Sequence, residues 1–429
     1  MLSAVLRALP GAGVDASPSG LYAIGTRLAT AGVFFLGGLL VLVLFDPERI
    51  GIFLSVTGLS AFAAVIDLGL TYSLLLAVSS RPSGSAGQFA WAALRVALPT
   101  VPVAAALLFA GGAALLLRGD VEANRWFWPW LSFCVLASVQ VVLMLGLTYV
   151  EGTGRRREAW RANFWIEVAG GAVLLGFIAA GQELWALAGG MLVRIVLTLV
   201  LIGVVFGLPP RGGPASGLEL WRRELWPMQW KNLINLLAGL LTTRLLTPLL
   251  LAAQGAVVAG QVGLMLSLAY LLTATASVLP LSQSGLYSNL YHEGRRDELG
   301  HAFRRTFVLG LGLAAASFAG AGLFCILLAH YSAFMAARFP EPAVIWLVLA
   351  SAPIGYAANC FATVLRSQRR DPGAVPNLLL TLPILAALSI AAHRDALAFA
   401  ITHLGTTSIV ALLYAVLLAR FLRALPGKA

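Results

Sequence analysis

The chain has 429 residues, of which 59% are hydrophobic and only 11% are charged, and its mean hydropathy is +0.88. This composition excludes a soluble globular protein, because a surface facing water carries many more charged side chains. The formal net charge of +11 suggests a nucleic-acid partner at first sight, but the distribution of the charges argues against one.

Twelve long apolar segments follow one another along the whole chain. About 20 residues of α-helix cross the ~30 Å hydrocarbon core of a bilayer, so each segment predicts a transmembrane helix. We expect helices at 21–45, 50–78, 89–117, 126–149, 162–180, 184–207, 228–251, 257–287, 307–328, 344–365, 375–392 and 396–418. The predicted fold class is all-α, a polytopic membrane protein with about 12 transmembrane helices.

The longest polar stretch between two predicted helices, 208–227, is rich in proline and glycine and leaves six helices on each side. The domains expected from this division are a cytoplasmic N-terminal segment at 1–20, an N-lobe at 21–207, a cytoplasmic linker at 208–227, a C-lobe at 228–422 and a cytoplasmic tail at 423–429. Two six-helix halves in the same orientation are common in transporters.

Lysine and arginine are distributed unevenly between the two sides of the predicted bundle. With both termini placed in the cytoplasm, 20 of the 29 lie on the cytoplasmic side, five on the outer side and four inside helices. This is the positive-inside pattern of a multi-pass protein in a cytoplasmic membrane. The basic loops therefore read as topology signals and contacts for anionic lipids, and we expect no nucleic-acid partner.

The sequence contains no pattern typical of a catalytic, metal or cofactor site. Cys134, Cys325 and Cys360 lie in predicted helices without the spacing of a metal site or a disulfide. Phosphate-binding loops and the motifs of zinc proteases and serine hydrolases are missing. We therefore expect no enzyme, no metal and no cofactor, and a transport cycle that uses a gradient or a substrate imbalance.

Charged residues inside the predicted helices are the main functional signal, because each costs roughly 2.5–3.5 kcal/mol at mid-membrane. Such residues usually face a partner or a wet cavity. They are Arg27, Asp67, Arg95, Glu167, Arg194 and Arg244. Four deep arginines against two deep carboxylates favour an anionic solute.

Hairpin geometry groups four of these charges into two pairs. Arg27 and Asp67 lie at equal distances along the chain from the turn near Pro47, and Glu167 and Arg194 are level about the turn at 181–182. We expect a structural ion pair between Glu167 and Arg194. For Arg27 and Asp67, a structural pair and a pair broken by a substrate or proton remain open, which makes Asp67 a candidate for gating or coupling.

Arg244 is the first candidate for binding phosphate. It lies sixteen residues into its predicted helix, and neither helix of its hairpin offers an obvious carboxylate. A guanidinium stays charged and matches the oxygens of a phosphate. Pairing with Asp67 or Glu167 across the bundle is the alternative. Arg95 lies two turns inside its helix, and its side chain either snorkels to the cytoplasmic surface or adds a further phosphate contact.

Two segments carry a resemblance to a known family. In 44–75, Gly51 and Phe53 open the second helix and the stretch Asp67-Leu68-Gly69-Leu70 closes it. The second segment begins with LWPMQWKNLINLLAGLL at Leu225 and continues with AAQGAVVAGQVGLMLSLAYLL. Both resemble bacterial O-antigen and polysaccharide flippases of the multidrug/oligosaccharidyl-lipid/polysaccharide (MOP) exporter superfamily.

The resemblance implies two six-helix lobes around a central cavity, which opens alternately to the two sides of the bacterial inner membrane. The implied cargo is an undecaprenyl-diphosphate-linked oligosaccharide for O-antigen or another surface polysaccharide. Arg244, Arg27 and Arg95 are then the candidates for contacting its pyrophosphate. The implied partners are this glycan, membrane lipids, a polysaccharide polymerase and other assembly proteins.

Three other functions compete with a flippase. A cation-coupled drug or metabolite antiporter of the same superfamily would favour acidic residues for its ligands. A membrane enzyme such as a polymerase or ligase would carry a large outer loop with catalytic residues, and none is present in the sequence. A non-catalytic scaffold in a glycan assembly complex has no distinguishing sequence pattern.

Overall fold

The computed structural model describes residues 18–79, 83–207, 217–366 and 374–424. Every regular element within these residues is a helix, so the predicted all-α fold class is confirmed. Within the same residues, eleven helices are long and apolar enough to cross a membrane, or up to twelve if one bent pair forms a single span. The chain is therefore a multi-pass membrane protein.

The helices fall into two groups. The first group contains α2 (Pro18–Leu44), α3 (Pro47–Ser60), α4 (Ala63–Ile66), α5 (Leu70–Ser79), α6 (Ser83–Arg118), α7 (Ala123–Gly152), α8 (Arg156–Ala179), α9 (Trp185–Val200), η1 (Leu201–Phe206), α10 (Gly217–Leu220), η2 (Trp221–Leu225), α11 (Trp226–Thr243) and α12 (Leu246–Gln254). The second group contains α13 (Ala256–Ser282), α14 (Ser284–His292), α15 (Arg296–Tyr331), α16 (Ala333–Ala336), α17 (Pro342–Arg366), α18 (Ala374–Ala392) and α19 (Ala396–Ala424).

The described chain divides into two compact units at Ala256 and Val257. The seventh predicted helix, now α11 and α12, packs against α3, α5 and α6 of the first unit. We expected it to open the C-lobe, because the polar linker precedes it. The linker marks where the chain leaves the membrane, whereas the packing of α12 depends on its own apolar surface. The lobes 21–207 and 228–422 stay a prediction.

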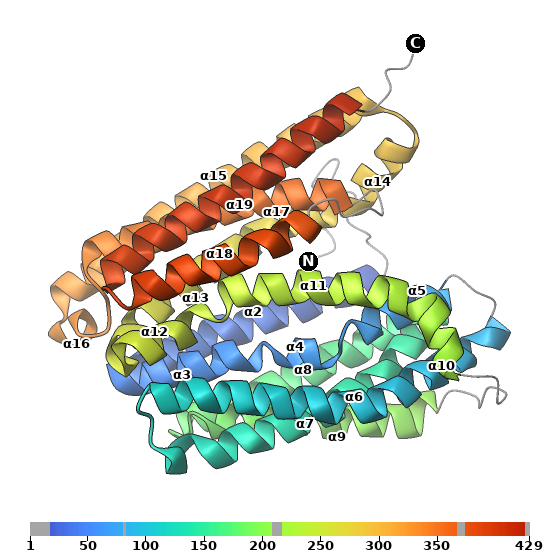
Figure 1. Ribbon diagram of the computed structural model, residues 1–429, viewed down its shortest axis with the longest axis horizontal. Helices are drawn as coiled ribbons and strands as arrows, with labels where there is room; N and C mark the ends of the chain where they lie inside the picture. The colour runs from blue at the N-terminus through green and yellow to red at the C-terminus, as the bar shows by residue number, and fades with distance from the viewer. Residues whose placement is uncertain (1–17, 80–82, 208–216, 367–373, 425–429) are drawn as a thin grey trace. The chain divides into compact units, whose positions relative to one another are not determined.

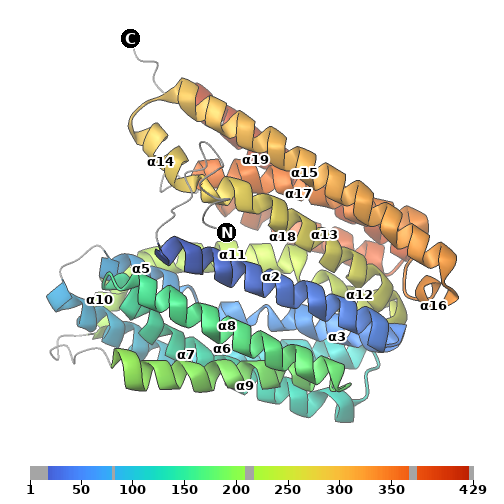
Figure 2. The same ribbon diagram turned by 180° about the vertical axis from the view of Figure 1, so that it is seen from behind.

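Within the first unit, α2 lies along α8, α8 along α9, and α6 along α7, as Figures 1 and 2 show. Large side chains such as Phe45, Phe89 and Trp130 are fully buried between these helices. In the second unit, α17 packs between α15 and α19 and buries Tyr356. Most of the helical stability therefore comes from apolar faces packed against neighbouring helices.

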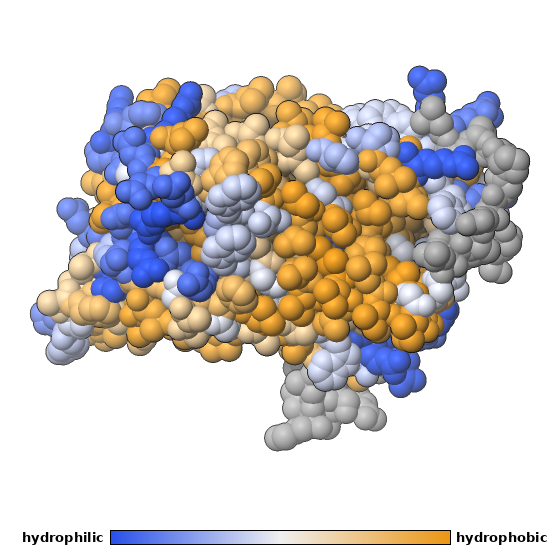
Figure 3. All heavy atoms as spheres, turned by 90° about the horizontal axis from the view of Figure 1, so that it is seen from below, coloured by the Kyte–Doolittle hydropathy of each residue, from blue (hydrophilic) through white to orange (hydrophobic). Residues whose placement is uncertain are grey.

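Large apolar side chains also cover the outside of the helices. Figure 3 shows a broad apolar zone on one face, with hydrophilic side chains gathered towards both ends. Leu107, Val204 and Leu382 are among these outward-facing residues. Exposed apolar surface of this extent on helices of membrane-spanning length is the surface that lipid tails cover.

Two of the predicted helices are interrupted. The second predicted helix is divided into α3, α4 and α5, which follow one another in Figure 1. Leu68 and Gly69 have φ angles of 50° and 73° just before α5. The left-handed region suits glycine and is unfavourable for leucine, so Leu68 is held in a strained conformation. The seventh predicted helix bends by 40° between α11 and α12.

Candidate functional site

Arg244 lies at the bend between α11 and α12. Its N–H still donates to the carbonyl of Leu240 at 2.7 Å, which completes the last turn of α11. In a continuous helix, the carbonyl of Arg244 would accept from the N–H of residue 248. That residue is Pro248, which has no N–H, so the helix cannot continue through this turn without losing a hydrogen bond. The sequence therefore places the break at the deep arginine.

The freed carbonyl of Arg244 faces a glycine on the neighbouring helix α3. A Cβ atom built on Gly58 would lie 2.6 Å from this carbonyl oxygen, closer than real Cβ contacts. Only glycine allows α3 and the bend to approach so closely. Gly58 therefore fixes the position of the bend against α3.

The guanidinium of Arg244 lies over the ring of Phe34 from α2, with 6.0 Å between its central carbon and the ring centroid. Arg244 therefore has an aromatic partner on another helix of the first unit. The sequence argument considered only carboxylates, on its own hairpin and across the bundle, whereas the face of an aromatic ring on a distant helix also attracts a cation. Arg244 remains partly exposed.

Chain distances place Arg244 near the middle of the membrane. We call the turns at 45–46, 119–122 and 180–184 the hairpin end of the first unit. Phe34 lies ten residues before α2 ends there, and Arg244 lies ten residues before the end of α12. At 1.5 Å per residue this is about 15 Å, half of the ~30 Å hydrocarbon core.

Arg27 lies on the same face of α2 as Phe34. The two residues are seven positions apart, which is two helical turns or about 10 Å along the axis. Arg27 is exposed and lies farther from the hairpin end than Arg244. Two arginines therefore stand at successive distances from the hairpin end of the first unit, and the role of Arg27 as a phosphate contact stays a prediction.

Asp67 lies at the end of α4, at the broken part of the second predicted helix. Its carboxylate accepts from the N–H of Thr71 at 3.1 Å and from the Thr71 hydroxyl at 2.6 Å. Among the described residues, no ion pair joins it to Arg27. In this conformation the carboxylate holds the start of α5.

Arg95 lies far from the bend. It is exposed on α6, 23 residues before Arg118 at the hairpin end. At 1.5 Å per residue this is about 35 Å, which is beyond the hydrocarbon core and at the level of lipid headgroups. The helix length therefore separates Arg95 from the level of Arg244, and both roles considered for Arg95, snorkelling and a further phosphate contact, stay predictions.

The structure brings Glu167 and Arg194 together. Nη2 of Arg194 lies 2.9 Å from Oε2 of Glu167, across the interface of α8 and α9. Thr198 donates from its hydroxyl to the carbonyl of Arg194 at 2.7 Å, and Gln140 of α7 reaches this hydroxyl at 3.4 Å. Three helices therefore share one polar cluster inside the first unit, in which the two charges neutralise each other.

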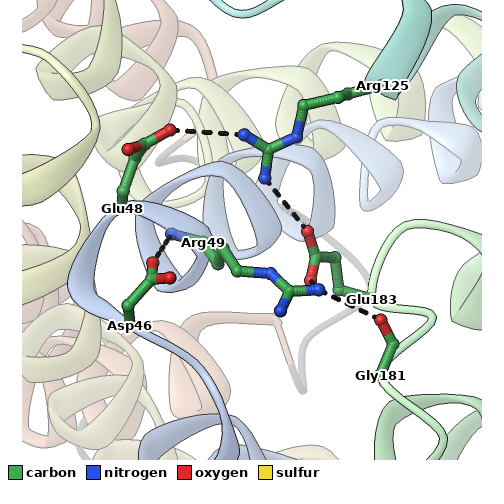
Figure 4. Close-up of polar contacts among 6 residues, drawn as sticks. All are labelled: Asp46, Glu48, Arg49, Arg125, Gly181 and Glu183. Carbon is green, nitrogen blue, oxygen red and sulfur yellow. Dashed lines mark hydrogen bonds and ion pairs between the residues drawn. The ribbon is translucent and has the colours of Figure 1, made fainter.

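A second charged cluster, which the sequence analysis missed, joins the starts of α3 and α7 to the turn between α8 and α9 at the hairpin end (Figure 4). The side chain of Glu183 is 8% exposed, and its carboxylate lies 2.5 Å from Nη2 of Arg49 and 3.4 Å from Nη2 of Arg125. Arg49 also donates to the carbonyl of Gly181, and Arg125 pairs with Glu48 at 3.3 Å. Its members come from the start of α3, the start of α7 and the turn between α8 and α9, which are far apart in sequence, so no local pattern indicates the cluster.

Within the described residues, no group of three or more histidine, cysteine, aspartate and glutamate side chains could hold a metal ion.

Neither a family model nor a curated protein sequence matches this chain. Solved structures do. An inward-facing multidrug resistance MATE family transporter of the MOP superfamily has a TM-score of 0.68 and 13% identity, covering 94% of this chain and 98% of its own. The lipid II flippase MurJ in an inward closed conformation has a TM-score of 0.70 and 9% identity, covering 95% and 88%.

A third similar structure is a MOP superfamily transporter from Pyrococcus furiosus, for which a reversed polarity of the binding pocket suggests a different function. It has a TM-score of 0.53 and 12% identity, and covers 96% of this chain and 97% of its own. The chain therefore has the fold that these MATE, MOP superfamily and MurJ structures share. These three structures are of transporters and a flippase, not of enzymes, and at this identity they establish the fold alone.

Proposed function

We propose that this protein is a flippase that moves an undecaprenyl-diphosphate-linked oligosaccharide across the bacterial cytoplasmic membrane by alternating access. The product would serve the synthesis of O-antigen or another surface polysaccharide. The observation that carries the proposal is the position of Arg244 at a helix break near mid-membrane, with Arg27 about 10 Å away in depth on the adjoining face of α2.

The two arginines match the chemistry of the cargo. A pyrophosphate is the part of a lipid-linked glycan that hydrocarbon excludes most strongly, and guanidinium groups form paired hydrogen bonds with phosphate oxygens. Arg27 would meet the pyrophosphate nearer the cytoplasm, and Arg244 would meet it deeper. The prenyl tail would remain in lipid beside the apolar surface of the helices, and binding must stay moderate so that the cargo can leave.

The deep carboxylates favour a flippase over a cation-coupled drug or metabolite antiporter. Such an antiporter needs carboxylates that are available to a cation. Glu167 is paired with Arg194, and both oxygens of Asp67 face the N–H of Thr71. The proposal keeps Asp67 as a gate, whose contact with Thr71 would give way when Arg27 and the cargo approach.

The proposed setting follows from the same function. Both termini would lie in the cytoplasm, since the basic residues gather on that side. A polysaccharide polymerase and other glycan assembly proteins would use the product on the outer face.

Deletion of the gene in a bacterium without a second flippase tests the proposal. Lipid-linked oligosaccharide should accumulate in the inner leaflet, and the surface glycan should disappear. Complementation with the wild-type chain should restore the glycan. A clean deletion with normal surface glycan would count against a flippase, and increased sensitivity to cationic drugs instead would favour the antiporter.

A further inference from the structure

The surface of the described residues contains two depressions lined by arginines. One, of about 530 Å³, lies at the start of α15 and is lined by His301, Arg304, Arg305, Val308 and Leu309. We propose that it is a binding site for an anionic phospholipid, whose phosphate meets the arginines and whose acyl chain lies on Val308 and Leu309. This inference does not depend on the transported cargo.

The five residues form one continuous exposed stripe along α15. Their spacing of three, four, seven and eight positions places them on the same face of a helix. All five side chains are exposed, including 58% of Val308 and 60% of Leu309. The stripe changes from cationic to apolar within two turns, as a phospholipid changes from headgroup to acyl chain.

The depth of the stripe agrees with this occupant. Tyr331, an exposed aromatic residue at the other end of α15, is 26 residues from Arg305. At 1.5 Å per residue the separation is about 39 Å, which exceeds the ~30 Å hydrocarbon core and reaches the headgroup layer. Leu309 lies about 6 Å closer to Tyr331, at the boundary where acyl chains begin.

The charges around the stripe also favour an anion. Arg295 holds the carboxylate of Glu298, at 2.5 Å, and that of Glu293, at 2.9 Å. His301 donates from Nδ1 to the carbonyl of Asp297 at 2.6 Å, which fixes the orientation of its ring. The positive-inside distribution places this end of α15 at the cytoplasmic leaflet, where anionic lipids gather.

The second depression differs in ways that make it a useful control. It is lined by Gly154, Arg155, Arg157, Glu158 and Arg161. No large apolar side chain lines this depression to hold an acyl chain. Replacing two arginines there removes the same amount of positive charge, on the same predicted side of the membrane, from a depression that lacks the apolar residues an acyl chain would contact.

The test is a lipid titration of the purified full-length protein in detergent, followed by native mass spectrometry. Phosphatidylglycerol should bind more tightly than phosphatidylcholine with the same acyl chains. R304Q/R305Q should weaken the tightest phosphatidylglycerol site by roughly 10–30-fold, since each arginine near a lipid surface contributes about 1 kcal/mol. R157Q/R161Q should leave that site unchanged, and R304K/R305K should retain most of its affinity.

Melting of each variant without lipid checks that it is folded, and the single variant R304Q replaces the double variant if the latter is not. Soluble glycerol phosphate should not displace the lipid, because the acyl chain contributes part of the affinity. Equal binding of phosphatidylcholine, displacement by glycerol phosphate, or unchanged phosphatidylglycerol binding by R304Q/R305Q and R304Q would each overturn the proposal.

Discussion

At the scale of single residues, the environment of each deep arginine separates two roles. Arg194 meets the carboxylate of Glu167, and the pair is neutral as a unit. Arg244 meets the ring of Phe34, which attracts a cation through its quadrupole and carries no formal charge. Arg194 therefore joins α8 and α9, and the proposed function assigns Arg244 to contact with a phosphate at the bend.

Replacement of Arg244 should impair transport while leaving the fold intact. A hydrogen bond to a charged group contributes about 1.5–3 kcal/mol, so Arg244→Ala should slow flipping of lipid-linked glycan in proteoliposomes by roughly 10–100-fold. Arg244→Lys should retain an intermediate rate, because it keeps the charge and loses the bidentate geometry. Arg118→Ala, on an exposed residue at the hairpin end, is the matched control. A full flipping rate for Arg244→Ala would remove Arg244 from the site.

Glu167 and Arg194 should behave as one stabilising unit. Glu167→Gln leaves a charged arginine in the membrane without its partner, which typically costs about 3–5 kcal/mol. Thermal melting in detergent should therefore show a clearly lower melting midpoint for Glu167→Gln and for Arg194→Gln than for the wild-type protein. The double variant should recover part of the lost stability. If the losses of stability in the two single variants simply add in the double variant, the two side chains are not coupled.

At the scale of elements, the bend between α11 and α12 depends on the helix beside it. Pro248 removes the hydrogen bond that would keep the helix straight, and Gly58 of α3 leaves room for the carbonyl of Arg244. The position of the arginine is thus set by one residue on its own helix and one on another.

Gly58→Ala should displace this bend. The added Cβ would lie 2.6 Å from the Arg244 carbonyl, and overpacking of this kind costs about 1–3 kcal/mol. We expect a lower melting midpoint and slower flipping of lipid-linked glycan. Gly38→Ala on α2 is the control, because its Cβ would meet nothing within 4 Å. Equal behaviour of the two variants would show that the bend does not need the close approach.

The ion cluster at the hairpin end should stabilise the first unit. The side chain of Glu183 is buried, whereas those of Arg49 and Arg125 are about one-third exposed. Glu183→Gln should therefore lower the free energy of unfolding by about 1–3 kcal/mol, a value between those for exposed and buried ion pairs. Glu293→Gln, which alters an exposed pair with Arg295, should cost much less. A much lower melting midpoint for Glu183→Gln than for Glu293→Gln would show that Glu183 stabilises the hairpin end, and equal midpoints would show that it does not.

Hydropathy and helix length predicted the all-α class and most helix positions, because lipid contact requires long apolar runs. Hairpin depth also indicated that Glu167 and Arg194 are level. The contact between Arg244 and Phe34 was not predictable in this way, since it joins α11 to a helix about 200 residues earlier in the chain. The broken helix at Leu68 was missed for a related reason: the run stays apolar, and only Gly69 in the sequence indicates a backbone with positive φ.

At the scale of the whole molecule, the described chain has a transporter fold shared by MATE transporters and the lipid II flippase MurJ. One fold therefore serves cargoes of different kinds, and the function of this chain depends on which charges its deep positions carry. Arg27 and Arg244 are cationic at two depths, while the deep carboxylates Asp67 and Glu167 are engaged within the protein. This arrangement supports the anionic lipid-linked cargo of the proposed function.

The most direct test of this account is the flipping of a fluorescent undecaprenyl-diphosphate-linked oligosaccharide in proteoliposomes that contain the purified full-length protein. A membrane-impermeant quencher reports how much of the label reaches the other leaflet. We predict that wild-type protein moves the lipid-linked glycan and that Arg244→Ala does so at most slowly. Absence of flipping by correctly folded wild-type protein, together with gradient-driven export of a cationic drug from the same vesicles, would contradict the flippase and favour the antiporter.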